Sequence, residues 1–154
     1  MSDLPLEFEH AFDMTIQVGQ AVAVNAAPNG ERRLIPILGG VVDGPMLKGN
    51  ILPGGMDLQW VRPDGVAEIS ACYTLEIERG RRALLHNRGL RWGELDVLSR
   101  LARGERVRAD EYYFRGSVWL ESGDSELEWV RRSVFACTGQ REPNAVRLAV
   151  YRVA

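Results

Sequence analysis

The chain has 154 residues, a size typical of a single domain with its own hydrophobic core, and we interpret residues 1–154 as one domain. Apolar residues make up 45% and charged residues 26%, and the formal net charge is −2, so no basic surface for nucleic acid is indicated. The acidic start of the chain is unlike a signal peptide, and no run approaches the roughly 18 apolar residues of a membrane span. We therefore expect a cytoplasmic protein without nucleic-acid or membrane partners.

Alternation of apolar and polar residues dominates the first half of the chain and predicts half-buried β-strands. An Asn-Gly pair precedes the second of these strands, and the sequence Arg-Pro-Asp-Gly follows the third; both are typical turn signals. The clearest strand contains Ile69, Tyr73 and Leu75 on an apolar face, with polar residues between them. The strands expected here span residues 6–18, 31–37, 57–61 and 66–78.

The second half of the chain predicts four more strands and one short α-helix near 93–103. The helix has apolar residues at helical spacing, acidic residues at its start and arginines at its end. A further helical turn is expected over 123–130. The strands span residues 83–92, 111–121, 131–140 and 145–153.

The order of these elements favours an all-β fold, because no strand–helix–strand rhythm appears. About eight antiparallel strands in one domain close well as a β-barrel, whose interior is either filled by side chains or holds one small ligand. A β-sandwich is the alternative.

The stretch 39–60, GGVVDGPMLKGNILPGGMDLQW, is rich in glycine and proline yet carries apolar residues throughout. It lacks the order GxxxxGK[ST] of a phosphate-binding loop. Glycine within a strand pattern marks a bulge, a bend or a close approach of two backbones. We interpret the stretch as two bent strands and a corner of the barrel.

Several motifs now resemble a known family, the "domain of unknown function 3237" family, over about Leu6 to Val153. They are IPILGGVVDGPMLKGNILPGGMDLQWVRPDG, CYTLEI, NRGLR, LARGE, EYYFR and VFACTGQR, in that order. The resemblance implies a closed antiparallel β-barrel of lipocalin or allene-oxide-cyclase shape, and it implies no established activity. The family often has an aromatic residue directly before the Gln that follows the Asp. Here Asp57 and Gln59 keep their places, and the aromatic residue is Trp60.

Alternation places three polar residues on faces that could meet the barrel interior. Tyr73 lies on the apolar face of its strand, and Asp57 and Gln59 share the face opposite Leu58 and Trp60. A phenol on the apolar face is also compatible with ordinary core packing.

The strand 83–92 mixes polar and apolar residues on both faces, so its pattern alone does not decide which face is internal. The resemblance marks Asn87, Gly89 and Arg91 as characteristic, and we therefore expect these residues to face inward. An internal Arg needs a partner, and Asp57 and Gln59 are the candidates. Such an Asp57–Arg91 pair could be catalytic or could serve only to fix the barrel.

The strand 111–121 offers two faces as well. Tyr112 and Phe114 lie on the more apolar one, and Tyr113 and Arg115 on the other. The apolar face is the simpler choice for the core, but a polar cavity would favour Tyr113 and Arg115, and we predict the latter pair as internal.

Neither metal nor cofactor is expected. The two His residues are far apart in sequence, and Cys72 and Cys137 lack metal-ligand spacing, so both cysteines are interpreted as buried free thiols.

Three functions remain open: an enzyme without cofactor, a carrier or sensor of a small ligand, and a structural module with a filled barrel. In the first, Asp57 is the base of a proton transfer, and Tyr73 and Arg91 stabilise negative charge on an oxygen, as in an isomerase, lyase or cyclase. The substrate would be a small, partly apolar molecule bound by Gln59, Asn87, Tyr113 and Arg115.

A homodimer or higher homo-oligomer is also expected, because Trp92, Trp119 and Trp129 are too many to fit inside one small barrel.

Overall fold

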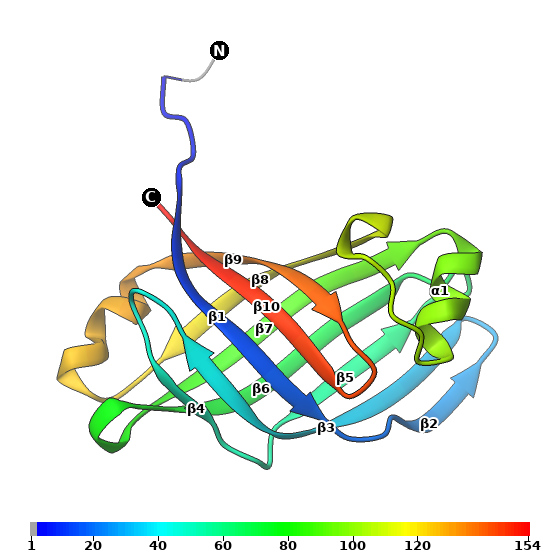
Figure 1. Ribbon diagram of the computed structural model, residues 1–154, viewed down its shortest axis with the longest axis horizontal. Helices are drawn as coiled ribbons and strands as arrows, with labels where there is room; N and C mark the ends of the chain where they lie inside the picture. The colour runs from blue at the N-terminus through cyan, green and yellow to red at the C-terminus, as the bar shows by residue number, and fades with distance from the viewer. Residues whose placement is uncertain (1–2) are drawn as a thin grey trace.

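The computed structural model describes residues 3–154, which form a ten-stranded antiparallel sheet that closes into a barrel (Figure 1). β1 closes it, because β1 pairs with β10 on one side and with β3 on the other. The barrel expected from the sequence is confirmed, and the sandwich alternative is wrong. In chain order the strands are β1 (Phe8–Val18), β2 (Val22–Ala27), β3 (Gly30–Asp43), β4 (Gly49–Ile51), β5 (Met56–Val61), β6 (Ala67–Ile77), β7 (Arg81–Gly93), β8 (Tyr112–Glu121), β9 (Val134–Arg141) and β10 (Ala145–Val153).

The strands occupy eight positions around the barrel because two positions are shared. β2 pairs with residues 30–34 of β3 and β1 with residues 37–43, so β2 continues the line of β1. β4 and β5 likewise share the position between β3 and β6. The sequence analysis missed β2 and β4. β2 is exposed along most of its length, and β4 has three residues, so neither shows the alternation of a half-buried strand.

The glycine-rich stretch 39–60 covers the end of β3, all of β4 and most of β5, and its backbone passes unusually close to neighbouring strands. A Cβ atom at Gly40, whose φ is +154°, would lie 2.2 Å from the Thr15 carbonyl oxygen on β1. A Cβ atom at Gly55 would lie 2.4 Å from Cβ of Tyr73 on β6. Glycine is therefore required at both positions by close packing, and Gly55 sets the start of the strand that carries Asp57.

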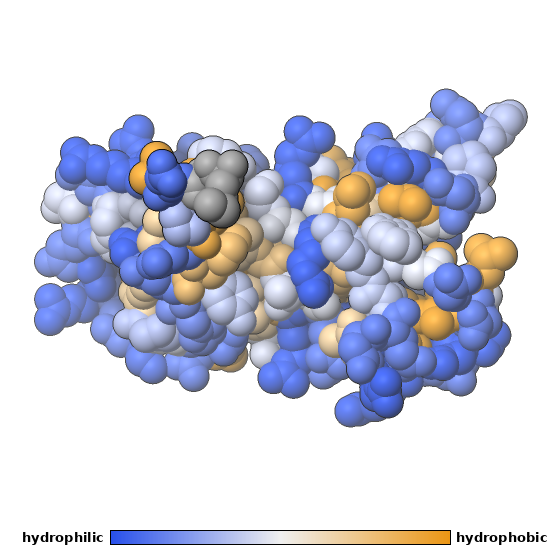
Figure 2. Space-filling model, turned by 90° about the horizontal axis from the view of Figure 1, so that it is seen from above, coloured by the Kyte–Doolittle hydropathy of each residue, from blue (hydrophilic) through white to orange (hydrophobic). Residues whose placement is uncertain are grey.

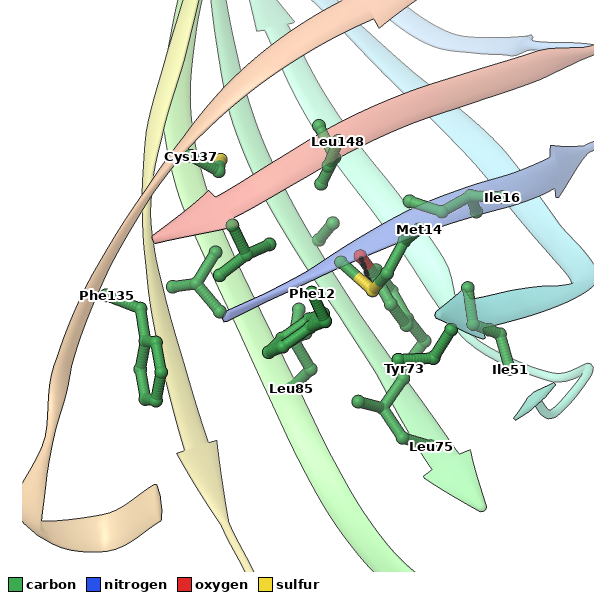
Figure 3. Close-up of a cluster of buried hydrophobic side chains, with 14 of the residues drawn as sticks. Phe12, Met14, Ile16, Ile51, Tyr73, Leu75, Leu85, Phe135, Cys137 and Leu148 are labelled. Atoms are coloured by element: carbon green, nitrogen blue, oxygen red, sulfur yellow. Dashed lines mark hydrogen bonds between the residues drawn. The ribbon is translucent and has the colours of Figure 1, made fainter. Parts of the chain in front are cut away.

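One end of the barrel is filled with apolar side chains. Phe12 and Phe135 contact each other with ring centroids 6.4 Å apart, and Trp129 meets Phe135 edge-on at 6.1 Å. Figure 3 shows Phe12, Phe135, Leu75 and Leu85 converging from strands across the barrel. The 3₁₀ segment η3 (Ser125–Arg132) adds Leu127 and Val130 to this core. We call this region the packed half.

The opposite end is covered by α1 (Leu95–Ala102), which lies far from η3 (Figure 1). The helix expected near 93–103 is confirmed and begins two residues later. It buries Val97 and Leu101, and it ends where Gly104, at φ +78°, adopts a left-handed conformation and donates its amide proton to the Leu101 carbonyl at 3.1 Å. The remaining 3₁₀ segments of the described chain are η1 (Glu78–Gly80) and η2 (Ala109–Glu111).

Candidate functional site

Beneath α1 the barrel is hollow and encloses a cavity of about 860 Å³. Its walls come from both the sheet and the helix, and Leu98 and Leu101 of α1 are part of its lining. The connection after β1 and the turn between β9 and β10 add Gln20 and Asn144 at the mouth. We call this region the hollow half. A cavity of this size suits a small organic molecule.

Asp57 enters the hollow half from β5, two residues before Gln59 on the same face, as the alternation predicts. Its Oδ2 accepts a hydrogen bond from Gln59 Nε2 at 2.8 Å, and its Oδ1 accepts one from the backbone N–H of Ser70 at 3.3 Å. Burial raises the pKa of Asp57, and these two hydrogen bonds and the charges of Arg91 and Arg141 oppose that shift. The carboxylate is thus partly desolvated but held in place by two donors.

Gln59 is almost fully buried, with an exposed fraction of 2%. Its amide group is oriented by Asp57, because an ionised carboxylate needs the N–H₂ end as a donor. The other end, Oε1, is the one enclosed side-chain polar atom among residues 3–154 that has no hydrogen-bond partner. An unpaired buried acceptor destabilises a fold by about 1–3 kcal/mol, so the orientation of Asp57 is maintained at a cost in stability.

Three arginines line the same cavity as this carboxylate: Arg33 from β3, Arg91 from β7 and Arg141 from β9. Arg91 is buried, and its guanidinium stacks over the Phe114 ring at 5.9 Å from the centroid. Burial and the nearby charge of Arg141 lower the pKa of Arg91 to about 10. Burial and the charge of Arg33 likewise lower the pKa of Arg141. The hollow half is therefore electropositive.

The predicted ion pair between Asp57 and Arg91 is wrong. Both side chains line the cavity and influence each other through space, but among residues 3–154 no ion pair joins them. Arg91 instead lies over the Phe114 ring, and Asp57 accepts hydrogen bonds from Gln59 and the Ser70 amide. Asp57 stands opposite Ala71 of β6 and Arg91 opposite Ala67, so the two side chains are offset by four residues along the sheet.

Tyr73 and Asn87 lie deeper, at the boundary between the two halves. Tyr73 is 2% exposed, and its hydroxyl donates to Met14 Sδ at 3.9 Å, a weak acceptor (Figure 3). Burial raises the pKa of Tyr73 well above its usual value, so it stays protonated. Asn87 fits beside Gly116, where a Cβ atom would lie 2.3 Å from Asn87 Oδ1. Asp57 and Asn87 both stand opposite Ala71 of β6, so they occupy one row across the sheet.

Tyr113 and Arg115 do not enter the cavity, so the predicted orientation of the strand 111–121 is wrong. Tyr113 is exposed and stacks on Trp92 outside the barrel at 5.5 Å, and Arg115 lies over the Tyr113 ring. Their neighbours Tyr112 and Phe114 face inward. The deciding constraint lies on β9, where a Cβ atom at Gly139 would lie 2.6 Å from Phe114 Cδ1. Gly139 thus leaves the space that the inward Phe114 ring occupies.

Sequence reasoning missed Arg33 and Arg141, although alternation could have found both. Arg33 has the same parity as the buried Ile35 and Ile37, and Arg141 has the same parity as the buried Phe135 and Cys137. Both arginines lie near the ends of predicted strands, where an Arg is ordinarily taken as solvent-exposed.

The cysteines are free thiols: Cys137 is buried and Cys72 is half-buried. Burial raises the pKa of Cys137 to about 11, which makes it a poor nucleophile. Among residues 3–154, no group of three or more His, Cys, Asp or Glu side chains is arranged to hold a metal ion. None of the helices in this part of the chain has the length and apolar character to span a membrane.

The comparisons with known proteins agree with this architecture. A family model described as "Protein of unknown function (DUF3237)" matches residues 6–153, which confirms the resemblance seen in the motifs. The crystal structure of a conserved protein of unknown function from Rhodopseudomonas palustris is similar, with 33% identity and a TM-score of 0.94, covering 98% of this chain and 99% of that chain.

Two further solved structures are similar. A β-barrel-like protein from Acinetobacter baumannii is 30% identical, with a TM-score of 0.85 and 99% of each chain covered. A protein described as an enzyme from Penicillium herquei is 16% identical, with a TM-score of 0.75, covering 100% of this chain and 98% of that chain. At that identity the last likeness shows a shared fold.

Proposed function

Because the chain belongs to the DUF3237 family, whose description assigns no function, we propose its function from the cavity itself: a cofactor-independent enzyme that catalyses a proton transfer on a small, partly apolar substrate. The reaction is of isomerase, lyase or cyclase type. The observation that carries the proposal is Asp57, a carboxylate with a raised pKa that faces a cavity of about 860 Å³. A desolvated carboxylate whose pKa is shifted toward neutrality is a suitable general base.

In the proposed reaction Asp57 takes a proton from a carbon or oxygen of the bound molecule, and the electron pair of the broken bond stays on the substrate. Negative charge then collects on a substrate oxygen. Asp57 returns the proton to another atom of the same molecule, so no electron is gained or lost overall. The hydrogen bonds from Gln59 and the Ser70 amide hold the carboxylate in a fixed orientation during both steps.

Arg91 and Tyr73 supply stabilisation for the developing charge. The N–H groups of the Arg91 guanidinium can donate to a substrate oxygen, because among residues 3–154 no hydrogen bond occupies them. The Tyr73 hydroxyl has only the weak acceptor Met14 Sδ and exchanges it readily for a charged oxygen. Asn87 and Gln59 line the wall and orient the substrate.

A non-catalytic carrier is the second candidate, because the cavity wall also presents apolar side chains such as Ile35, Ile69 and Leu98. A carrier needs the same enclosed volume but makes no use of a base. The likeness to a Penicillium herquei protein described as an enzyme supports the catalytic alternative only at the level of the fold.

Exchange of substrate hydrogen with D₂O tests the proposal even while the product is unidentified. A library of small carbonyl compounds and organic acids is incubated with the protein in D₂O, and deuterium uptake is followed by mass spectrometry. We expect uptake into at least one compound, reduced about 10²-fold or more in Asp57→Asn and less strongly in Tyr73→Phe. The matched control is Asp13→Asn, which removes an exposed carboxylate on β1.

Equal uptake in Asp57→Asn and the native protein would show that Asp57 is not the base. A ligand that copurifies and is released unchanged, with no exchange in any compound, would favour the carrier.

A further inference from the structure

The charged residues of the hollow half are unbalanced. Its lining contains Arg33, Arg91 and Arg141 but one carboxylate, Asp57. Glu31 is not part of the lining, but its Oε1 accepts from Arg33 Nε at 3.2 Å. Even with Glu31 included, the cations outnumber the carboxylates by three to two. Buried or half-buried cations without counter-charges are unfavourable, so an excess of this kind indicates a ligand of opposite sign.

Arg91 is a buried cation to which the protein provides no paired counter-ion. Its exposed fraction is 8%, and among residues 3–154 no carboxylate forms an ion pair with it. The guanidinium carbon lies over the Phe114 ring, 5.9 Å from its centroid, and among residues 3–154 no hydrogen bond from the side-chain N–H groups of Arg91 is present, so these donors can bind a ligand. These donors match the two oxygens of a carboxylate.

Arg141 lies near Arg91, as its effect on the pKa of Arg91 shows. Its backbone N–H donates to the Tyr112 hydroxyl at 2.8 Å, which fixes the end of β9 against β8. Its side chain lines the cavity, and it too has no ion pair among the described residues. Two guanidinium groups from β7 and β9 therefore line one cavity, and Asp57, the carboxylate of that lining, forms an ion pair with neither of them.

We propose that the substrate is an organic anion whose carboxylate binds between Arg91 and Arg141, with its apolar body against Ile35, Ile69 and Leu98. The excess of one positive charge favours a monoanion over a phosphate ester or a dicarboxylate. Asp57 is then next to the apolar body rather than to the bound carboxylate, since like charges repel. The description of the ligand as a substrate rests on the proposed function, but the binding of the anion does not depend on catalysis.

A matched pair of fluorescent probes tests the charge preference. 1-Anilinonaphthalene-8-sulfonate is an apolar monoanion, and N-phenyl-1-naphthylamine is the same ring system without the sulfonate. Their dissociation constants are measured by fluorescence titration for the native protein and for Arg91→Gln and Arg141→Gln. Each substitution is expected to weaken binding of the sulfonate about tenfold or more and binding of the neutral probe less than twofold. The control is Arg115→Gln, which removes an exposed arginine on the outer face of β8 and is expected to change neither.

Competition extends the test from sulfonate to carboxylate. We expect 4-phenylbutyrate to displace the sulfonate probe from the native protein and its neutral analogue 4-phenylbutanol to displace it at least about tenfold less well. Arg91→Lys keeps a charge at this position and is expected to recover part of the affinity that Arg91→Gln loses. Circular dichroism confirms that each variant is folded before titration.

An unchanged ratio of the two probe affinities in both Arg91→Gln and Arg141→Gln would overturn the inference. So would an equal loss in Arg115→Gln, which would place the probe on the outer surface. Asp57→Asn separates this inference from the proposed function: it is expected to abolish deuterium exchange while the sulfonate binds as well as before or more tightly. If no compound exchanges deuterium in the screen, the proposed anion site is unaffected. If the charge preference is lost, the assignment of Asp57 as the base is unaffected.

Discussion

The two ends of the barrel are built from the same strands but differ in what their side chains do. In the packed half, Phe12, Leu85 and Phe135 fill the space between strands, and each is fully buried. In the hollow half the same strands place arginines and a carboxylate around a cavity. The first arrangement maximises burial of apolar surface, whereas the second leaves charges poorly solvated. The difference teaches that the apolar core and the charged cavity occupy separate segments of one barrel.

Removal of a packed side chain should have the largest effect on stability. Phe135→Ala deletes a ring that Phe12 and Trp129 contact, and we expect the free energy of unfolding to fall by about 3–5 kcal/mol. Urea denaturation measures it. Where the variant remains folded, the ratio of the two probe affinities should stay as in the native protein. A change in that ratio would mean that the two halves are not independent.

Removal of a charge in the hollow half should raise the free energy of unfolding. Arg91→Met replaces a buried cation by an apolar side chain, and we expect the free energy of unfolding at pH 7 to rise by roughly 1–3 kcal/mol. Burial in the folded protein lowers the pKa of Arg91 to about 10, so the penalty is fully present at pH 7 and fades as the pH rises above 10 towards the ordinary pKa of an arginine. Lower stability of Arg91→Met at pH 7 would show that this cation supports the fold.

Asp57 offers a smaller test with a defined pH dependence. Burial raises its pKa in the folded protein above the ordinary 3.8, so the native protein loses stability as the pH rises from 3.8 through the folded-state pKa. Asp57→Asn escapes this loss and should melt at a higher temperature than the native protein at pH 7. The two melting temperatures should converge as the pH falls below 3.8. An advantage that persists at low pH would assign the effect to packing instead, and Asp13→Asn is the control.

The sequence determined the barrel more securely than it determined the site. Alternation identified eight of the strands and placed Asp57, Gln59 and Tyr73 on internal faces. A strand that is buried on one face alternates apolar and polar residues, so its internal face can be read from the sequence. For the strand 111–121 alternation favoured the face of Tyr112 and Phe114, which is the internal one, and the prediction is wrong because it gave more weight to a polar cavity. There the outcome depends on a small residue of the next strand, Gly139, which admits the Phe114 ring.

The charge imbalance could not be predicted because it depends on three strands that are distant in sequence. Arg33, Arg91 and Arg141 have internal parity when each strand is considered alone, but only the closed barrel brings them to the same end. Likewise, a contact between Asp57 and Arg91 depends on the distance between β5 and β7, and no sequence pattern gives that distance.

The outer face of β8 should show the smallest effects on stability. Tyr113→Phe removes an exposed hydroxyl while keeping the ring that stacks on Trp92, so we expect a change within about 0.5 kcal/mol and unchanged binding of both probes. A loss of probe binding would show that this face, and not the cavity, holds the ligand.

Self-association also stays a prediction. Trp92 and Trp119 are exposed on β7 and β8, whereas Trp129 is partly buried against the packed half. Figure 2 shows that apolar side chains on one face of the molecule lie interspersed among hydrophilic ones. Light scattering after size exclusion should give a multiple of the chain mass of 17.2 kDa, and a species of 17.2 kDa alone would rule the homodimer out under those conditions.

A crystal structure of the protein with 1-anilinonaphthalene-8-sulfonate tests the central claim most directly, namely that the hollow half is an anion-binding site beside a base. We predict the sulfonate between the guanidinium groups of Arg91 and Arg141, with the rings on the apolar wall near Asp57. Probe ordered on the outer face around Trp92 and Tyr113, with solvent alone in the cavity, would contradict it.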